Sequence, residues 1–214
     1  MREIFKIKDI EEIYSILDNS SYGTLALSKG VVPYSVPINF ARVKNCLYLH
    51  GSKKGKKMDF LKHNKNVSFS VVGYESIIPS YFSSTNGLAC PATTFFSSVI
   101  IEGVAQIITN YNQKVIALEA IMQKLQPSGG YKPLNQEVYK KAINATAIIK
   151  IVPYKISAKA KFGQNLDRNR FNMIIENLEK SSSKDDLQLI DNLRRYYDLQ
   201  NCNAWWYRRC FKAS

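Results

Sequence analysis

The feature that most constrains this chain is a succession of short β-prone segments separated by turn residues. The segments are rich in β-branched and aromatic residues, and Lys29-Gly30 and Lys44-Asn45 stand between neighbouring ones. Such punctuation predicts strands joined by turns. Pro33 and Pro37 accompany the second segment, which is therefore expected at a sheet edge or with a bulge. The predicted strands are Thr24–Ser28, Tyr34–Val43, Cys46–His50, Val67–Val72, Phe95–Thr109 and Thr146–Val152.

Helices are predicted around these strands. Asp9 and Glu12 form a capping box ahead of the first helix, and apolar residues at helical spacing mark the later ones. The segment from Tyr74 to Thr94 is interpreted as a loop, and Pro153 is expected to close the last strand. The later helices are predicted at Lys56–His63, Asn112–Gln126, Gln136–Ile143, Arg168–Lys180 and Lys184–Tyr197.

The order of these elements favours one fold class. Strands and helices do not alternate strictly, and the chain has no Gly-x-Gly-x-x-Gly sequence, which argues against a Rossmann-type sheet. Many short strands with a few covering helices favour an antiparallel barrel. We therefore predict a mainly β, Greek-key-like antiparallel barrel with flanking helices and a C-terminal helical extension.

The chain carries a large positive excess. Of its 214 residues, 30 are Lys or Arg and 17 are Asp or Glu, so the formal net charge is +13. Such a charge attracts nucleic acid, acidic lipid headgroups or phosphorylated small molecules. The sequence shows no basic helix interleaved with aromatic residues and no RNP-type aromatic pair, so a nucleic-acid partner is the weaker hypothesis.

Other classes of protein are disfavoured by simple counts. No run of about 18 apolar residues predicts a membrane-spanning helix, and the N-terminus lacks the apolar segment of a secretory signal. The four cysteines form no Cys-x-x-Cys pair and no Cys/His cluster, so we expect no metal site and a cytoplasmic, thiol-reduced protein. Cys90 is interpreted as a small buried apolar residue rather than a nucleophile.

A basic, glycine-containing loop at a strand–helix junction is the strongest local signal of chemistry. Lys53-Lys54-Gly55-Lys56-Lys57 follows the strand that ends near His50 and opens a predicted helix. Backbone N–H groups at a helix start, flanked by ammonium groups, suit a phosphate. On composition alone, a solvated basic loop remains the alternative interpretation.

Four ordered segments, taken together, resemble the pyridoxamine-phosphate-oxidase-like superfamily of FMN-binding split barrels. The nearest branch holds the nitroimidazole-resistance type of flavoproteins, with Tyr-Gly-Thr-Leu-Ala, Pro-Tyr-x-Val-Pro-x-Asn, a His-containing basic segment and Ser-Val-x-x-x-Gly-x-Ala. The matching segments here are Tyr22–Ala26, Pro33–Asn39, Tyr48–Lys57 and Ser98–Ala105. The resemblance extends to residue 161, which implies an FMN-binding split-barrel domain over 1–161 and a helical extension and tail over 162–214.

The resemblance also implies roles for individual residues. It implies that FMN is the cofactor, that His50 lies near the flavin as a catalytic acid, and that the protein is a homodimer with FMN at the interface. His50 alone would equally be a satisfied polar side chain at a strand end. The implied cofactor-binding residues are Pro37, Ile38 and Asn39 along the ring, Ser52, Lys53, Lys56 and Lys57 at the phosphate, Ser98 at the phosphate or ribityl chain, and Lys159.

Two departures limit what the resemblance implies. Ser157-Ala158-Lys159 stands where relatives often have Ser-Gly-Lys, so the ligand contact of Lys159 is weakened, and the tail with Trp205 and Trp206 has only a loose parallel. The expected function is a flavin-dependent oxidoreductase acting on a small planar acceptor, nitroaromatic in the nearest branch. Pyridoxamine-phosphate oxidation itself is disfavoured because the phosphate-binding, Arg-rich tail expected of that enzyme is not recognisable in this sequence. The alternative is a non-catalytic flavin- or haem-binding or sensing protein.

Overall fold

The structure is a computed structural model that describes residues 1–181 and 183–211, with side chains described for 1–180 and 183–198. Among the described residues, none of the helices combines the length and apolar character that a membrane crossing needs. The helices are α1 Ile10–Asn19, α2 Lys56–His63, α3 Tyr111–Leu125, α4 Lys140–Ala145, α5 Arg168–Ser181 and α6 Lys184–Phe211, with short 3₁₀ turns at Glu3–Phe5, Ser80–Phe82 and Glu137–Tyr139.

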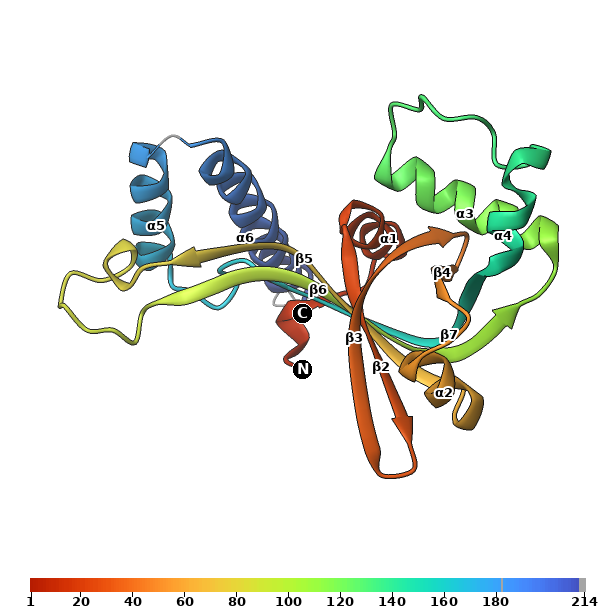
Figure 1. Cartoon of the computed structure of the whole chain (residues 1–214). Helices are drawn as coiled ribbons and strands as arrows, with labels where there is room; N and C mark the ends of the chain where they lie inside the picture. The colour runs from red at the N-terminus through yellow and green to blue at the C-terminus, as the bar shows by residue number, and fades with distance from the viewer. Residues whose placement is uncertain (182, 212–214) are drawn as a thin grey trace. The chain divides into compact units, whose positions relative to one another are not determined.

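A seven-stranded sheet forms the centre of the fold. Its order is β1-β7-β4-β3-β2-β5-β6, and a further pairing of β6 with β7 closes it into a barrel. The observed architecture confirms the predicted mainly β fold with flanking helices and C-terminal helices (Figure 1). The strands are β1 Lys6–Ile7, β2 Tyr22–Lys29, β3 Val32–Val43, β4 Cys46–Ser52, β5 Asn66–Ile78, β6 Thr93–Ile108 and β7 Thr146–Lys161.

The chain forms two compact units, and the long strands β5, β6 and β7 contribute to both. Unit 1 comprises Met1–Ile7, Tyr74–Ser97 and Lys159–Ser214, whereas unit 2 comprises Lys8–Gly73 and Ser98–Ala158. The predicted boundary after residue 161 stays a prediction.

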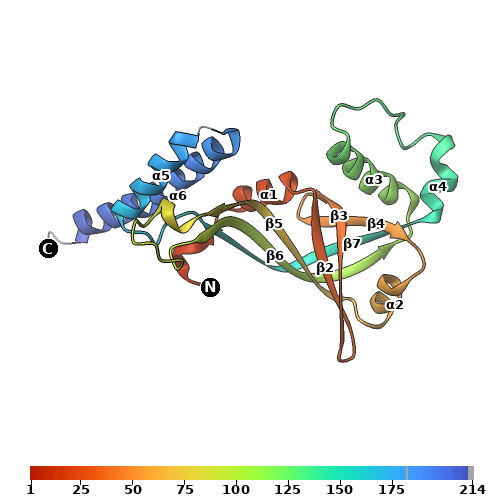
Figure 2. The ribbon, with the colours of Figure 1, turned by 60° about the vertical axis from the view of Figure 1, so that its left-hand side comes forward.

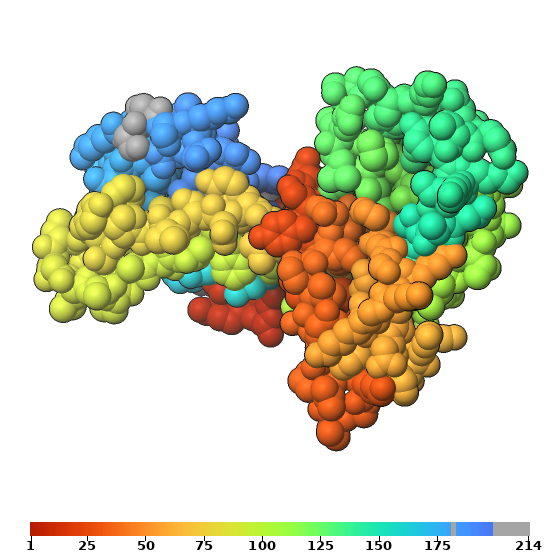
Figure 3. All heavy atoms as spheres, in the orientation of Figure 1, coloured from red at the N-terminus to blue at the C-terminus, as the bar shows by residue number. Residues whose placement is uncertain are grey.

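Unit 2 holds most of the sheet and the helices α1 to α4. α3 packs on the sheet through a cluster in which Ala117 contacts Ile108 and Ile148, with Tyr48 and Leu118 at its edge. The hairpin of β2 and β3 projects from this unit as two long paired strands (Figures 2 and 3). It is held by an antiparallel register that runs from Tyr22↔Asn39 to Lys29↔Val32.

Unit 1 is built around aromatic side chains. Phe162 stacks on Tyr196 of α6 at 5.1 Å between ring centroids and also contacts Phe95 and Tyr74. Burying several rings in one cluster contributes both area and ring-to-ring attraction. The helices α5 and α6 lie side by side in this unit, as Figures 1 and 2 show. The indoles of Trp205 and Trp206 lie outside the described side chains.

The structure contradicts three predictions made from the sequence, namely where β5 ends, where β7 ends and whether Cys90 is buried. β5 continues to Ile78, into the segment predicted as loop, and β7 runs through Pro153 to Lys161. The proline is tolerated because the pairing of β4 with β7 ends at Leu47↔Ile151, before Pro153 would have to donate to it. Cys90 is exposed rather than buried.

Candidate functional site

The strands β3 and β4 separate halfway along their length. Their antiparallel pairs run only from Val43↔Cys46 to Phe40↔Leu49. Beyond that point, Asn39 and the residues before it pair with β2, whereas the residues from His50 to Ser52 pair with β7. The separation therefore leaves the edge of β3 and the edge of β4 facing one split in unit 2.

The residues predicted to lie along a flavin ring occupy the β3 edge of this split. Pro37 and Asn39 are exposed and Ile38 is half-buried. β3 is not the edge strand that the sequence suggested, because it lies between β4 and β2 in the sheet, but Pro37 falls where β3 has no pairing with β4, so its missing N–H group is tolerated there. Asn39 Nδ2 donates a hydrogen bond to the carbonyl of Ser21 at 3.0 Å, which fixes its side chain against the start of β2.

His50 lies on β4 where this strand separates from β3, and one of its ring nitrogens has no partner among the described residues. Its Nδ1 atom is buried and makes no hydrogen bond with any residue that the structure describes. Burial of the ring lowers the pKa of His50 below its usual value, and the charge of Lys57 lowers it further. A buried nitrogen without a partner is uncommon in folded proteins and marks a place where a ligand could supply one.

Lys57 approaches the same strand from the first turn of α2. A Cβ atom added to Gly51 would lie 2.8 Å from Lys57 Nζ, so the ammonium fills the space that a side chain at this position would take. Burial lowers the pKa of Lys57 below that of a free lysine. The structure thus places Lys57 against Gly51, the strand neighbour of His50, and its charge acts on the His50 ring, although successive residues of a strand face opposite sides of the sheet.

The loop between β4 and α2 is shaped by a serine and a glycine. Ser52 Oγ accepts a hydrogen bond from the backbone N–H of Lys54 at 3.1 Å. Gly55 has a φ of 106°, in the region that favours glycine, and its carbonyl accepts from the backbone N–H groups of Met58 and Asp59. The turn directs the exposed Lys53 and Lys54 toward solvent just ahead of the helix.

The side chain of Lys56 does not lie beside that of Lys57. Its ammonium lies 4.6 Å from the centre of the Tyr34 ring and 5.6 Å from that of Phe60, as a cation–π contact. Adjacent residues at a helix start point in different directions, so the two lysines predicted to hold one phosphate lie on different sides of α2 in this structure.

Lys114 is a residue of this region that sequence reasoning missed. The side chain is buried on α3, and Nζ donates to the carbonyls of Ile143 at 3.2 Å and Thr146 at 2.6 Å. Thr146 pairs with Ser52, so Lys114 holds the end of α4 where β7 begins beside the loop. The sequence around Lys114 does not indicate that this side chain anchors α4 and β7, because its partners lie about 30 residues further along the chain.

Ser98 and Lys159 lie outside the group around Lys57. Ser98 is half-buried on β6, on the same face as the exposed Ile100, because alternate residues of a strand share a face. Lys159 belongs to unit 1, where its ammonium lies 4.8 Å from the centre of the Phe96 ring. Among the described residues, no group of three or more His, Cys, Asp or Glu side chains could hold a metal ion.

The closed antiparallel sheet, with β3 and β4 separated at Asn39 and His50, defines the class of this protein as a split β-barrel. A family model described as pyridoxamine 5'-phosphate oxidase matches residues 9–160. The chain belongs to this family. The comparison with curated proteins gave no match.

Solved structures share the fold at low sequence identity. A candidate 5-nitroimidazole antibiotic resistance protein from Bacteroides thetaiotaomicron is 22% identical, with a TM-score of 0.58 over 72% of this chain and 85% of that one. The flavocytochrome Anf3 from Azotobacter vinelandii is 24% identical, with a TM-score of 0.63 over 76% and 73% of the two chains. An FAD- and haem-binding protein from Mycobacterium smegmatis is 20% identical, with a TM-score of 0.62 over 74% of each.

Proposed function

We propose that this protein binds FMN at the split between β3 and β4 and acts as a flavin-dependent oxidoreductase on a small planar acceptor. The single observation that carries the proposal is the buried, unpartnered Nδ1 atom of His50 on the strand that the partly buried ammonium of Lys57 approaches at Gly51. A bound anion with hydrogen-bonding groups would relieve both costs at once. Membership of the pyridoxamine 5'-phosphate oxidase family supports a flavin as that ligand.

The phosphate end of the proposed site uses the loop and the first turn of α2. A flavin phosphate is close to dianionic at neutral pH, and Lys57 and Lys53 would neutralise it with point charges. The hydroxyl of Ser52 would add a donor. Lys56 would have to leave the rings of Tyr34 and Phe60 to join them, so its contribution to affinity is expected to be smaller than that of Lys57.

The ring end uses the edge of β3. The backbone of Pro37, Ile38 and Asn39 runs along the split with β2 as its sole paired neighbour there, which leaves polar backbone groups for the ring edge. When bound, the flavin supplies the redox chemistry of the reaction. His50, with its lowered pKa, would be neutral near pH 7 and would hold or pass a proton at Nδ1.

A homodimer with FMN at the interface is part of the proposal. Large apolar side chains are exposed on the strands of unit 2, among them Val72 on β5 and Ile100 on β6. Ile100 shares its face of β6 with Ser98, so a second copy covering Ile100 would also cover the serine predicted to contact the cofactor. Sedimentation equilibrium of the full chain tests the dimer, and a monomer at micromolar concentration would contradict it.

The acceptor and the exact flavin belong to the proposal too. The fold neighbours include proteins described as binding FAD or haem, so FMN is to be compared with FAD, riboflavin and haem in one assay. A nitroaromatic acceptor is the first to test, given the description of the Bacteroides neighbour. A cytoplasmic location is likewise proposed from the small number of cysteines, which form no disulfide framework in the sequence.

The experiment that tests FMN binding is a fluorescence-quenching titration of the full chain with FMN and with riboflavin. Lys57→Gln is expected to weaken FMN binding about tenfold or more, because a charge-assisted contact to phosphate is lost, and to leave riboflavin binding nearly unchanged. Lys62→Gln, on the exposed face of the same helix, is the matched control and should change neither. If Lys57→Gln weakened the binding of FMN and riboflavin equally, Lys57 would have no role at the phosphate. If neither flavin quenched the fluorescence, the proposal of flavin binding would be overturned.

Catalysis is tested separately from binding. The flavin-loaded protein is reduced chemically under argon, and the rate of reoxidation by nitroaromatic and quinone acceptors is compared with the rate by oxygen. Reoxidation by an acceptor faster than by oxygen, slowed in His50→Gln, supports an oxidoreductase. If every acceptor is slower than oxygen, the protein is a flavin carrier or sensor and the enzyme proposal fails.

A further inference from the structure

A cavity lies wholly within unit 1. It has a volume of about 210 Å³ and is enclosed by the 83–93 segment, the end of β7 and the first turns of α5. This volume is below the roughly 300–1,000 Å³ of pockets that take drug-sized ligands, so it suits a small molecule. The lining residues are Ser83, Cys90, Pro91, Ala92, Thr93, Phe95, Lys161, Asn165, Leu166, Arg170 and Ile174.

The lining contains both buried apolar side chains, called the floor below, and two cations, called the rim. Phe95 and Ile174, each with an exposed fraction of 1%, belong to the floor. Two cations, Lys161 from β7 and Arg170 from α5, line the same space, and none of the lining residues is an Asp or Glu. Two positive groups that line a small cavity repel each other, and an anion bound between them would offset this repulsion.

The side-chain acceptors that the two cations contact are hydroxyls, and most of the N–H donors of the cations stay available for a ligand. Lys161 Nζ donates to Thr93 Oγ1, and Arg170 Nη2 donates to Ser83 Oγ at 3.4 Å, near the long limit of a hydrogen bond. A guanidinium has five N–H donors and an ammonium three, so these two contacts satisfy few of them. Ser83 is buried, with an exposed fraction of 3%, so its contact with Arg170 lies away from solvent.

The electrostatics of the rim point the same way. Burial lowers the pKa of Lys161, and the nearby positive charge of Lys159 lowers it further. This lysine therefore bears a cost in its charged form that a bound anion would offset.

We propose that this cavity binds a small phosphate-bearing anion, with Arg170 and Lys161 neutralising its charge and the hydroxyls of Thr93 and Ser83 completing its hydrogen bonds. Arg170 offers the planar fork that matches phosphate oxygens, and Lys161 adds a point charge. The apolar floor has room for the few carbon atoms of a small phosphate ester. This site uses no residue of the proposed flavin site and does not depend on it.

The test is a calorimetric titration of the full chain with inorganic phosphate and with glycerol phosphate at constant ionic strength. Saturable binding is expected, weakened about tenfold or more in Arg170→Gln. Arg168→Gln removes the same charge from an exposed position of α5 and is the matched control, expected to bind like the unaltered protein. Tighter binding of the ester than of free phosphate would identify an organic ligand, and equal binding would identify the anion alone; both support the site.

Two further variants keep the test decisive. Ala92→Phe places a ring at an exposed lining position without changing charge, and it should block binding even if Arg170→Gln folds poorly. Lys57→Gln should retain phosphate binding at this cavity. The proposal is overturned if phosphate does not saturate, if Arg170→Gln and Arg168→Gln weaken it equally, or if Lys57→Gln alone removes it.

Discussion

Lys57 holds its ammonium beside the strand that carries His50, and its charge is one of the two causes that keep the pKa of that imidazole low. The larger cause is burial of the ring. The two residues lie seven positions apart and are joined by a tight loop, so their proximity follows from the β4–α2 turn and not from a shared helix face. This relationship can be measured directly, because the chain has only two histidines.

Removing the charge of Lys57 should raise the pKa of His50. In Lys57→Gln the repulsion between ammonium and imidazolium is gone, so protonation of His50 becomes easier, while burial still holds the pKa below its ordinary value. Titration of the imidazole proton signals by NMR measures this, with the signal of the exposed His63 as reference. An unchanged or lower pKa of His50 would show that the ammonium does not act on the ring.

The same lowered pKa predicts a direction for stability. The folded protein binds a proton at His50 less readily than the unfolded chain, whose histidine has a pKa of about 6.5. Stability should therefore fall as the pH drops through and below about 6.5. His50→Gln should reduce this part of the acid dependence, as measured by urea unfolding between about pH 5 and pH 8. A pH dependence identical in both proteins would contradict it.

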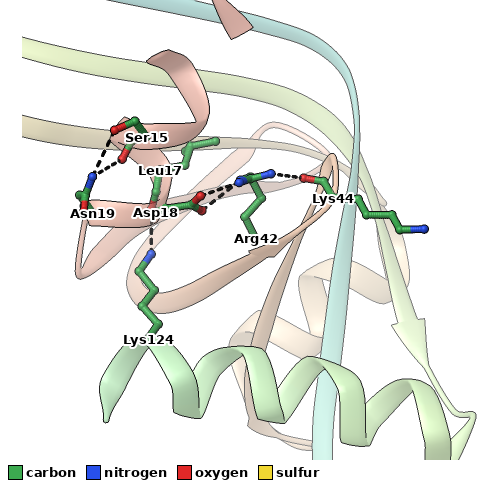
Figure 4. A network of polar contacts seen from close by, with 7 residues as sticks. All are labelled: Ser15, Leu17, Asp18, Asn19, Arg42, Lys44 and Lys124. Carbon is green, nitrogen blue, oxygen red and sulfur yellow. Dashed lines mark hydrogen bonds and ion pairs between the residues drawn. The ribbon is translucent and has the colours of Figure 1, made fainter. Parts of the chain in front are cut away.

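Lys124 gives a second pH dependence, at the alkaline end. Figure 4 shows its Nζ donating to the carbonyl of Leu17 in α1, beside the ion pair of Asp18 with Arg42. Nζ also lies 3.7 Å from the centre of the Phe40 ring. Burial lowers the pKa of Lys124 from 10.5 to about 8, which the charge of Asp18 opposes and that of Arg42 reinforces.

Stability should increase between about pH 8 and pH 10.5 through this residue, because over that range the unfolded chain binds the proton and the folded protein has released it. The full shift corresponds to roughly 3 kcal/mol, and since Lys124 is half-exposed, solvent screening reduces the expected gain to about 1 kcal/mol. Urea unfolding at neutral and alkaline pH measures it. Lys124→Met should lack this gain, and an equal gain in the variant would assign it to other groups.

Lys114, a buried lysine of unit 2, should stabilise the fold at every pH near neutrality. Lys114 Nζ donates to the carbonyls of Ile143 and Thr146, so Lys114→Met removes two hydrogen bonds made by a buried ammonium, although the Ile143 carbonyl still accepts from the backbone N–H of Thr146. The expected loss of unfolding free energy is about 3 kcal/mol. Lys141→Met, at an exposed position of α4, is the control and should change stability by less than about 0.5 kcal/mol. Similar losses in both variants would mean that the packing of α3 against the end of α4 and the start of β7 does not depend on the Lys114 ammonium.

The fold was predictable where local signals agree with tertiary structure. Residues 56 to 63 were predicted as a helix with the bounds that the structure has, because Gly55 precedes it and the apolar Met58 and Leu61 share a face. The end of β7 was mispredicted, since Pro153 breaks a strand only where a neighbour needs its N–H group, and the register of β4 had already ended. Local sequence does not reveal which neighbour a strand has.

The candidate site was predictable in part for the same reason. The basic loop and His50 are visible in the sequence, and the loop brings Lys57 back to β4. The divergence of Lys56 onto Tyr34 depends on the path of β3, and the lack of a partner for His50 Nδ1 depends on where β3 and β4 separate. Both are consequences of strand register, for which adjacent residues carry no signal.

Gly51→Ala separates the packing of the site from its charge. The added Cβ would lie 2.8 Å from Lys57 Nζ, and the nearest atom it meets is the end of a flexible side chain, so the ammonium moves and the backbone stays. The unfolding free energy should change by less than about 1 kcal/mol. Binding of FMN should weaken about tenfold, because the displaced ammonium no longer faces the phosphate, while riboflavin binding changes less than about twofold. Fluorescence titration with both flavins measures this. If both flavins weaken together, Gly51 is needed for the ring or the fold, and the position of Lys57 beside it does not determine phosphate recognition.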